Sequence, residues 1–473
     1  MSKADFYMWL PRVTTLLFVG AFGACAGSLI NVLVYRLPRG MGVVTPASRC
    51  PQCQTKLTWR ENIPVLGWII LRGRCRFCKS KISAEYPIVE AIVGLLFMVF
   101  YGLWYLVPQG SGFLGQIKPE WAYNDEGMAF AFQTWPAFVV LILLVASLVA
   151  MTIVDAKTYT IPLVLAWVPL GIGIIGHTAH GLWFDLAHGA FELTGPGIWR
   201  AADRTRWISE IGWTWTITTP SPEGWRWVGA AFGGVVGLLL ANGLLALGVI
   251  RRSFADYDEW EAKELAARKA SRPADAPDAG EETDRAGPEH GPEEESEGDE
   301  SAADLWIQYP FARREMIKEM AFLAPVVCAA IVGAWLLNPA GGPLAPSGPA
   351  PLWVLALSGS LLGAFAGGGV VWAVRILGSL AFGKEAMGLG DVHLMAAVGA
   401  CLGWIDPVIA FFGAAFVGVA WALLGVLIGG GFKRAMPYGP FLAVATLLTL
   451  LCKPWIEVLL GRLSGAGGPL NLP

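Results

Sequence analysis

The sequence predicts an all-α polytopic membrane protein with about eight to ten transmembrane segments, a small cytoplasmic zinc-ribbon-like loop and a disordered acidic linker. Of its 473 residues, 55% are hydrophobic and only 15% are charged, and the mean hydropathy is +0.53. Such a composition excludes an ordinary soluble globular protein and is typical of an integral membrane protein. The net charge of −3 gives no indication of nucleic-acid binding.

Ten segments are apolar enough to be membrane helices, for which about 20 residues are needed. The first contains the run Val13–Val34, which is long enough to remain as a span rather than a cleaved signal. The eighth is short and is either a half-span or a tight hairpin with the ninth, broken at Asp406-Pro407. The ten segments comprise residues 12–35, 86–107, 136–154, 161–178, 228–250, 320–338, 352–375, 392–404, 407–429 and 438–459.

Basic residues predict which loops face the cytoplasm, because cytoplasmic loops carry an excess of Lys and Arg. The loop 36–85 has ten Lys or Arg and two acidic residues, so it should be cytoplasmic. The next loop, 108–135, has one Lys and three acidic residues, so it should be outside. Counting onward places Asp155 and Asp391 on the same, cytoplasmic side.

Two stretches depart from the membrane pattern. Residues 255–304 carry eighteen acidic and five basic residues, a composition that predicts a disordered cytoplasmic linker. Residues 179–227 contain seven tryptophans, which favour the membrane–water interface, so we expect this outer loop to lie against the headgroups. A binding role for the tryptophan-rich loop is the alternative.

Four of the eight cysteines form two CxxC pairs in the loop 36–85. Cys50 with Cys53 and Cys75 with Cys78 are separated by 21 residues, a spacing that suits a small zinc ribbon. Four protein ligands would make the site structural rather than catalytic. Disulfides are disfavoured because the loop is predicted to face a reducing cytosol, and a redox CxxC pair should not occur twice.

The other four cysteines, Cys25, Cys328, Cys401 and Cys452, lie in apolar runs, where we expect packing roles.

Two aspartates lie where a long apolar segment meets water. Asp155 closes the run Phe138–Val154, and Asp391 ends the sequence Met387-Gly388-Leu389-Gly390-Asp391 before another apolar run. A carboxylate near a bilayer is costly and therefore indicates a functional site. Two carboxylates that meet in space can share a proton and activate water. The alternative for each is a simple helix cap.

Helix dipoles predict unequal proton affinities for this pair. Asp391 should stand at a helix N-terminus, where its charge is favoured, and Asp155 at a helix C-terminus, where it is disfavoured. His393 either tunes Asp391 or is simply a residue of the membrane interface. The chain lacks HExxH and GxSxG sequences, which argues against a metalloprotease with the first motif and a serine hydrolase with the second.

Two other classes of function use the same residues. In a transporter or channel the aspartates would be proton or cation sites, but such sites lie near the bilayer midplane and these two stand at segment ends. In a non-catalytic membrane scaffold the linker and the cysteine loop would bind partners, which leaves the paired aspartates unexplained.

The sequence resembles the prepilin peptidases of type IV pilus and type II secretion systems, membrane aspartic proteases of the GxGD type. The motifs that carry the resemblance, over roughly residues 12–178 and 352–450, are 27–38 (GSLINVLVYRLP), the double CxxC loop with 59–64 (WRENIP), 86–90 (YPIVE), Asp155 with Ile161-Pro162, 387–392 (MGLGDV) and 437–441 (PYGPF).

The resemblance implies an enzyme of the bacterial inner membrane that cleaves the leader of a prepilin or pseudopilin precursor at the cytoplasmic face. It also implies S-adenosylmethionine-dependent N-methylation of the new N-terminal residue. By resemblance the catalytic residues are Asp155 and Asp391, and the zinc ligands are Cys50, Cys53, Cys75 and Cys78. The expected partners are the precursor and the lipid bilayer.

The sequence departs from the family pattern at three places. His393 replaces a usual Lys, Leu163 replaces a frequent acid, and region 179–351 exceeds the pattern. We therefore divide the chain into a first span (1–35), a cytoplasmic zinc-binding loop (36–85), a membrane core with the first aspartate (86–178), a tryptophan-rich outer loop (179–227), inserted spans with the linker 255–304 (228–351) and a membrane core with the GxGD motif (352–473).

Overall fold

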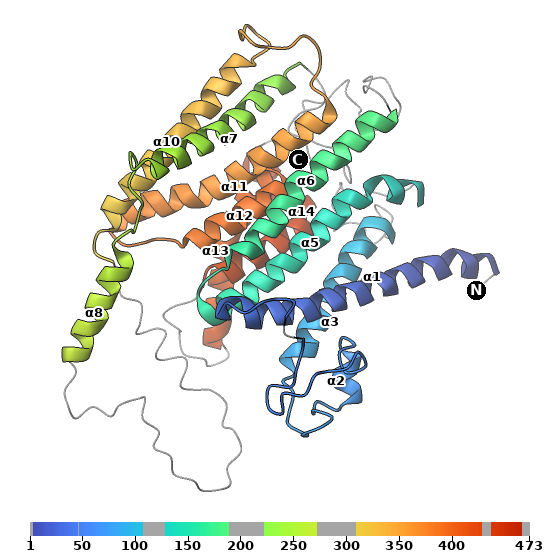
Figure 1. The fold of residues 1–473 in the computed structure, drawn as a ribbon. Coiled ribbons are helices and arrows are strands. Elements are labelled where there is room, and N and C mark those ends of the chain that lie inside the picture. Colours follow the sequence, from blue (N-terminus) through green and yellow to red (C-terminus); the bar gives the residue numbers. More distant parts are fainter. Residues whose placement is uncertain are drawn as a thin grey trace.

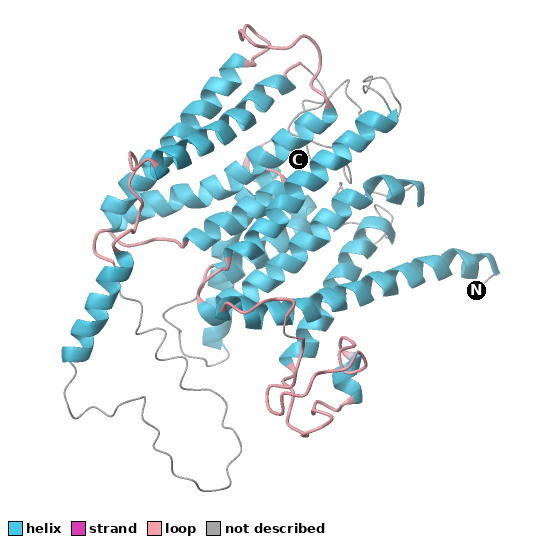
Figure 2. Cartoon of the chain, viewed as in Figure 1, coloured by secondary structure: helices cyan, strands magenta, loops and turns pink. Residues whose placement is uncertain are grey.

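The computed structural model describes residues 3–45, 47–106, 128–188, 222–271, 309–427 and 437–465. Helices make up almost all of this part of the chain (Figures 1 and 2). The described ranges contain no strand, only the isolated bridges Arg49–Lys56 and Arg74–Lys81. The predicted all-α class is therefore confirmed.

The described helices are α1 (Lys3–Arg36), α2 (Leu66–Ile70), α3 (Glu85–Tyr101), α5 (Met128–Thr158), α6 (Leu163–His188), α7 (Gly224–Ala246), α8 (Tyr257–Ser271), α10 (Ala312–Leu336), α11 (Leu352–Phe382), α12 (Leu389–Leu402), α13 (Ile405–Leu427) and α14 (Gly439–Leu463), with short turns at Leu37–Arg39 and Gly102–Leu106. Each of the ten predicted segments overlaps a described helix, whereas α2 and α8 have no predicted counterpart.

Eight of these helices are long and apolar enough to cross a membrane. Helix α14 makes a ninth span if its two parts, bent by 85° between Lys453 and Trp455, count as one. The expected short eighth segment is α12, which has only 14 residues.

The helices pack side by side, with α5, α6, α12 and α14 at the centre (Figure 1). Helices α1 and α3 pair on one flank, α11 covers α6 and α12, and α7 with α10 forms the opposite flank. Fully buried side chains such as Leu144, Met151, Leu394 and Met395 fill the centre. This core lies directly beneath the ends of α5 and α12, where the two aspartates stand.

Glycines allow two helix pairs to approach closely. A Cβ on Gly363 of α11 would lie 2.1 Å from the carbonyl oxygen of Gly399 in α12, and one on Gly229 of α7 would lie 2.1 Å from that of Gly333 in α10. Small residues at such contacts are typical of helix packing in membranes, where close van der Waals contact replaces the hydrophobic effect. The α11–α12 contact fixes the helix that carries Asp391.

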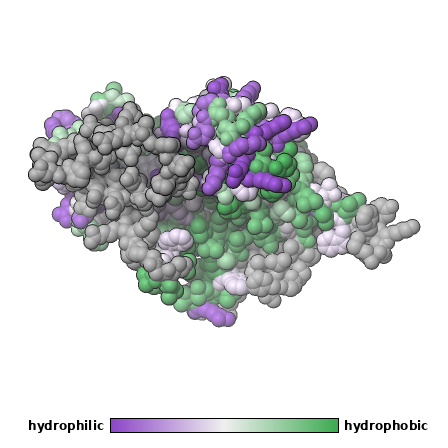
Figure 3. Space-filling model, turned by 90° about the horizontal axis from the view of Figure 1, so that it is seen from below, coloured by the Kyte–Doolittle hydropathy of each residue, from purple (hydrophilic) through white to green (hydrophobic). Residues whose placement is uncertain are grey.

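Several helix ends are tied together at one end of the bundle, at the lower left of Figure 1. The ties join α5 to α3 (Lys157 Nζ to Glu85 Oε1, 2.5 Å), α5 to α14 (Asp155 with Gly439) and α10 to α11 (Arg313 Nε to the Leu380 carbonyl oxygen, 2.9 Å). Viewed from below, hydrophilic side chains gather beside a broad hydrophobic surface (Figure 3).

The expectation of disorder over 255–304 is wrong for residues 257–271, which form α8. This stretch is rich in helix-forming residues, and Glu259 and Lys263 form an i,i+4 ion pair at 2.5 Å. Aromatic contacts of Tyr257 and Trp260 with Tyr309 hold its first turn against the start of α10. The rest of the predicted linker, and residues 189–221 of the tryptophan-rich loop, lie outside the described residues.

Candidate active site

Asp155 lies in the last turn of α5, where the core meets the end of the bundle. Its side chain is only 6% exposed, and its Oδ2 accepts a hydrogen bond from the backbone N–H of Gly439 at 3.1 Å. These residues are 284 positions apart in the sequence, so this contact joins α5 to the start of α14. The carboxylate is therefore buried and held by backbone.

Asp391 is the third residue of α12 and is 8% exposed. Gly388 precedes the helix in an extended conformation (φ −72°, ψ 150°) and turns the chain into it. A Cβ on Gly390 would lie 3.1 Å from the Cβ of Ile161, which follows Asp155 by six residues. The glycines thus let the start of α12 approach the turn after α5, as expected from their position.

The structure brings the two aspartates together. Both stand at the same end of the bundle, beside Ile161: a Cβ on Gly390, next to Asp391, would lie 3.1 Å from the Ile161 side chain, and a Cβ on Gly439, which binds Asp155, would lie 3.2 Å from it. The predicted inequality from helix dipoles is not supported, however. Asp155 ends α5, but it also binds the first N–H of α14, so each carboxylate stands at a helix N-terminus.

Sequence reasoning missed the role of Gly439. A Cβ at this position would lie 2.5 Å from Asp155 Oδ2, closer than Cβ atoms approach other heavy atoms, so a glycine lets the backbone reach the carboxylate where it stands. The neighbouring Tyr438 lies within the electrostatic influence of Asp391. Its hydroxyl donates a hydrogen bond to the Phe411 carbonyl oxygen at 3.3 Å. The Tyr-Gly-Pro at a helix start was the available signal for this close approach.

His393 uses its ring within its own helix. Its Nδ1 lies 2.8 Å from the carbonyl oxygen of Leu389, one turn earlier in α12. This contact favours the hypothesis that His393 is a residue of the membrane interface over the hypothesis that it tunes Asp391.

The four loop cysteines form one cluster, as predicted. Their Sγ atoms all lie within 4.8 Å of one another; Cys50 and Cys78 are 3.8 Å apart, and Cys53 and Cys75 are 4.0 Å apart. A tetrahedral site with Zn–S bonds of about 2.3 Å separates its sulfurs by roughly 3.8 Å. Disulfide sulfurs would lie about 2 Å apart, so the cluster has the geometry of a metal site.

The two CxxC pairs are built in the same way. Cys50 N donates to the Thr55 carbonyl oxygen (3.0 Å), and Cys75 N donates to that of Ser80 (2.8 Å). Each pair is followed by a residue in the left-handed region, Gln54 with φ 56° and Lys79 with φ 62°. This repeated turn curves the backbone around the sulfur atoms, so that each CxxC pair contributes two cysteines to the cluster.

Hydrogen bonds also favour the thiolate form of two of these cysteines, Cys50 and Cys78. The Ser80 hydroxyl, 3.1 Å from Cys78 Sγ, lowers the pKa of that thiol to about 6. Backbone N–H groups, with Cys53 contributing most, lower the pKa of Cys50. Thiolates are the form that binds metal.

The expectation of packing roles for the remaining cysteines holds for part of the set. Cys401 is buried and Cys452 is half-buried, whereas Cys25 and Cys328 are exposed on their helices.

Comparisons with known proteins identify two regions of the chain. Residues 21–104 match the Bacterial Peptidase A24 N-terminal domain, and residues 320–423 match the Type IV leader peptidase family. The second match contains Asp391, whereas Asp155 lies between the two. It also covers residues 320–351, which we had expected to exceed the family pattern. No solved structure gives a significant match.

Curated relatives match the same chain. It is 49% identical over 87 residues (18% of this chain, 25% of the relative) to a prepilin leader peptidase/N-methyltransferase of Myxococcus xanthus, and 40% identical over 104 residues (21% and 44%) to one of Klebsiella pneumoniae. It is 28% identical over 231 residues (41% and 71%) to one of Dickeya chrysanthemi.

The matches to the first four relatives span 25% to 56% of the length of those proteins. The two family models nevertheless match in succession along one chain, around a cysteine cluster and a helix that begins with Gly-x-Gly-Asp. Residues 21–104 and 320–423 of this chain are therefore similar to type IV leader peptidases.

Proposed function

We propose that this protein is a membrane aspartic endopeptidase that cleaves the leader peptide of type IV prepilin-like precursors and N-methylates the new N-terminal residue. The observation that carries the proposal is the pair of buried carboxylates, Asp155 and Asp391, which stand at the same end of the helix bundle beside Ile161. The names of the similar proteins supply the substrate class and the methylation.

The chemistry requires one carboxyl group ionised and the other protonated. The ionised group takes a proton from a water molecule, and the protonated group donates a hydrogen bond to the scissile carbonyl oxygen. The water oxygen attacks the carbonyl carbon, and the C–N bond then breaks as the carboxyl group that took the water proton gives it to the leaving amine nitrogen. Burial favours this sharing, because two adjacent charges cannot both be maintained at low cost away from water.

A cytoplasmic location for this site is supported by its basic surroundings. Lys157, Arg313 and Arg314 lie at the same end of the bundle as the aspartates, and Lys and Arg are enriched on the cytoplasmic side of membrane proteins. The apolar helix of a prepilin would lie in the bilayer against the spans, which would bring its leader to the carboxylates.

The cysteine cluster fits zinc best among common metals, because four thiolates at tetrahedral spacing are a typical zinc site. Cys50, Cys53, Cys75 and Cys78 would hold the ion and leave no open coordination position. Bound zinc would therefore stabilise the loop, and the methylation with S-adenosylmethionine would depend on that loop for its organisation rather than for metal chemistry.

The aspartate assignment is tested by Asp155→Asn and Asp391→Asn. Each variant is co-expressed with a prepilin precursor, and the product is analysed by intact mass, which reports cleavage and methylation together. We expect each substitution to reduce cleavage by at least about 10³-fold, because a dyad loses its proton exchange when either partner is an amide. Cleavage at the wild-type rate in either inserted variant would remove the dyad from the mechanism.

A further inference from the structure

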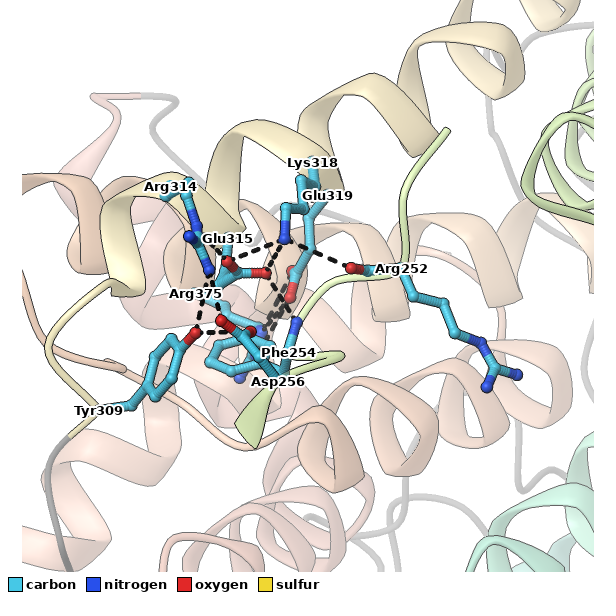
Figure 4. Close-up of polar contacts among 9 residues, drawn as sticks. All are labelled: Arg252, Phe254, Asp256, Tyr309, Arg314, Glu315, Lys318, Glu319 and Arg375. Atoms are coloured by element: carbon cyan, nitrogen blue, oxygen red, sulfur yellow. Dashed lines mark hydrogen bonds and ion pairs between the residues drawn. The ribbon is translucent and has the colours of Figure 1, made fainter. Parts of the chain in front are cut away.

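Arg375 is a buried cation that links three segments of the chain. It is only 2% exposed within α11. Its Nε and Nη2 donate to the carboxylate of Glu319 in α10 at 3.1 to 3.3 Å (Figure 4). Its Nη1 donates to the Glu385 carboxylate and to the Met387 carbonyl oxygen. Met387 is the first residue of the motif Met387-Gly388-Leu389-Gly390-Asp391.

Glu319 fixes the orientation of this guanidinium. The Glu319 side chain is 5% exposed, and its Oε2 also accepts a hydrogen bond from Trp372 Nε1 at 2.6 Å. A guanidinium is a planar fork, so a carboxylate that holds one edge determines where the remaining nitrogen points. That remaining nitrogen reaches the loop between α11 and α12.

The loop 384–388 is held by side chains of α11. Helix α11 ends at Phe382, Gly383 follows it with φ 71°, and the chain must then reach Gly388, which precedes α12. Ser379 Oγ accepts a hydrogen bond from Ala386 N at 3.0 Å, and Arg375 binds the following residues. The position of α12's first turn therefore depends on these contacts.

We propose that Glu319 and Arg375 are positioning residues that hold the loop 384–388 and thereby set Asp391 against Asp155. This inference rests on the proposed peptidase function. Burying an Arg–Glu pair is costly and is often replaceable by apolar side chains without loss of stability. A further hydrogen bond, from Arg375 to the Met387 carbonyl oxygen, gives the pair a use beyond neutralising charge. The charge of Arg375 also acts on Asp391 through space.

Glu315 provides a matched control one turn earlier in α10. It is fully buried, with 0% exposure, and accepts hydrogen bonds from Lys318, Arg314 and the Phe254 N–H at 2.7 to 2.9 Å. Arg314 extends this group to Asp256 and Tyr309 (Figure 4). These hydrogen-bond partners belong to α10 and to the segments beside it, although the ring of Phe254 also lies over the Arg375 guanidinium, with 5.5 Å between Cζ and the ring centroid. Glu315 thus shares the burial and charge of Glu319, but its carboxylate accepts its hydrogen bonds from other groups than Arg375.

The experiment compares Glu319→Ala with Glu315→Ala in lipid nanodiscs, with purified prepilin as substrate. We expect Glu319→Ala to lower kcat about tenfold or more with KM unchanged, because a displacement of about 1 Å in a catalytic group can cost up to 10²-fold in rate. We expect Glu319→Gln, which keeps one acceptor oxygen, to recover part of the loss. Glu315→Ala should keep kcat within about twofold of wild type while changing the unfolding temperature similarly.

Hydrogen exchange of residues 383–390 gives a second readout that needs no substrate. The loop should exchange faster in Glu319→Ala than in wild type or Glu315→Ala. If the unpaired arginine prevents Glu319→Ala from folding, Glu319→Leu/Arg375→Met removes both charges at similar volume and should show the same two effects. Equal kcat and equal exchange in the 319 and 315 variants would overturn the inference.

Failure of the proposed function is a separate result. Absence of prepilin cleavage by the wild-type protein would reject the peptidase assignment, while the exchange comparison would still decide whether Glu319 and Arg375 hold the loop.

Discussion

At the residue scale, Gly439 shows how closely backbone can be used to hold a carboxylate. Its N–H donates to Asp155 Oδ2 at 3.1 Å, and its missing side chain leaves the space that the carboxylate occupies. A hydrogen bond from backbone is more rigid than one from a side chain, because no rotamer has to be fixed. Gly439 thus fixes Asp155 from a distant part of the sequence.

Gly439→Ala should therefore impair cleavage without preventing membrane insertion. The new Cβ would lie 2.5 Å from Asp155 Oδ2 and would displace the carboxylate. We expect the cleavage rate, measured by intact mass of the precursor, to fall roughly 10- to 100-fold.

Gly425→Ala is the matched control. A Cβ at Gly425 of α13 meets nothing within 4 Å, so this variant should cleave at the wild-type rate. A wild-type rate in Gly439→Ala as well would show that Asp155 tolerates displacement, contrary to the proposed geometry.

At the scale of elements, the cysteine loop has little apolar core of its own. Leu66, Ile69 and Ile70 of its short helix α2 are all more than half exposed. The loop is attached to the bundle where Val65 N donates to Glu90 of α3 at 2.7 Å. A module of this kind depends on its metal for stability, because the binding energy of the ion replaces the missing core.

Removal of the metal should unfold the loop and leave the helix bundle intact. We expect about one equivalent of zinc per purified chain and its loss in Cys75→Ser, measured by elemental mass spectrometry. Hydrogen exchange of residues 47–83 should then increase, and methylation of the product should fall more than its cleavage.

The control for this prediction is Cys328→Ser, a cysteine exposed on α10 and remote from the cluster in sequence. It should retain zinc. Retention of zinc in Cys75→Ser would mean that the four cysteines are not a single site.

Helix α8 shows the same dependence on neighbours. The acidic composition of residues 255–304 predicted disorder, but the first part is helical where it contacts the folded bundle. Asp256 accepts hydrogen bonds from the Tyr309 hydroxyl (2.7 Å) and from Arg314 (2.8 Å), which lower its pKa to about 2. The acidic composition is a property of residues 255–304 as a whole, whereas these contacts stabilise only the start of that stretch.

At the scale of the whole molecule, three features lie at one end of the bundle (Figure 1). They are the helix ends with the two aspartates, the cysteine loop and the start of α8. The opposite end is joined by Trp225 Nε1 to the Gly348 carbonyl oxygen (3.0 Å) and Trp353 N to Asp185 (3.1 Å). The aspartates, the cysteine loop and the start of α8 therefore share one side of the apolar helices.

This arrangement predicts a single sidedness for all three features. An epitope inserted near residue 285 should be digested by protease in inverted membrane vesicles and protected in intact spheroplasts, because positive residues keep that end cytoplasmic. An epitope near residue 205, in the tryptophan-rich loop, should behave in the opposite way. The reverse pattern for the two epitopes would place the aspartates outside the cell and contradict the proposed access of prepilins.

Much of this architecture was predictable from local sequence. Runs of apolar residues locate the spans, because each helix must satisfy its own backbone hydrogen bonds in lipid. The spacing of Cys50, Cys53, Cys75 and Cys78 predicts a cluster, because each CxxC pair closes on itself within a few residues. The position of Asp155 and Asp391 at segment ends already indicated their proximity.

The sequence by itself thus determined the helical membrane class, the cysteine cluster and the placement of both aspartates at helix ends. Only the tertiary structure decided that Gly439 binds Asp155 from 284 residues away, and that Arg375 joins Glu319 to the loop before Asp391. Hydropathy and motif spacing report on neighbours along the chain. Contacts between distant segments depend on how helices pack, and therefore on which glycines allow close approach and which buried charges find partners.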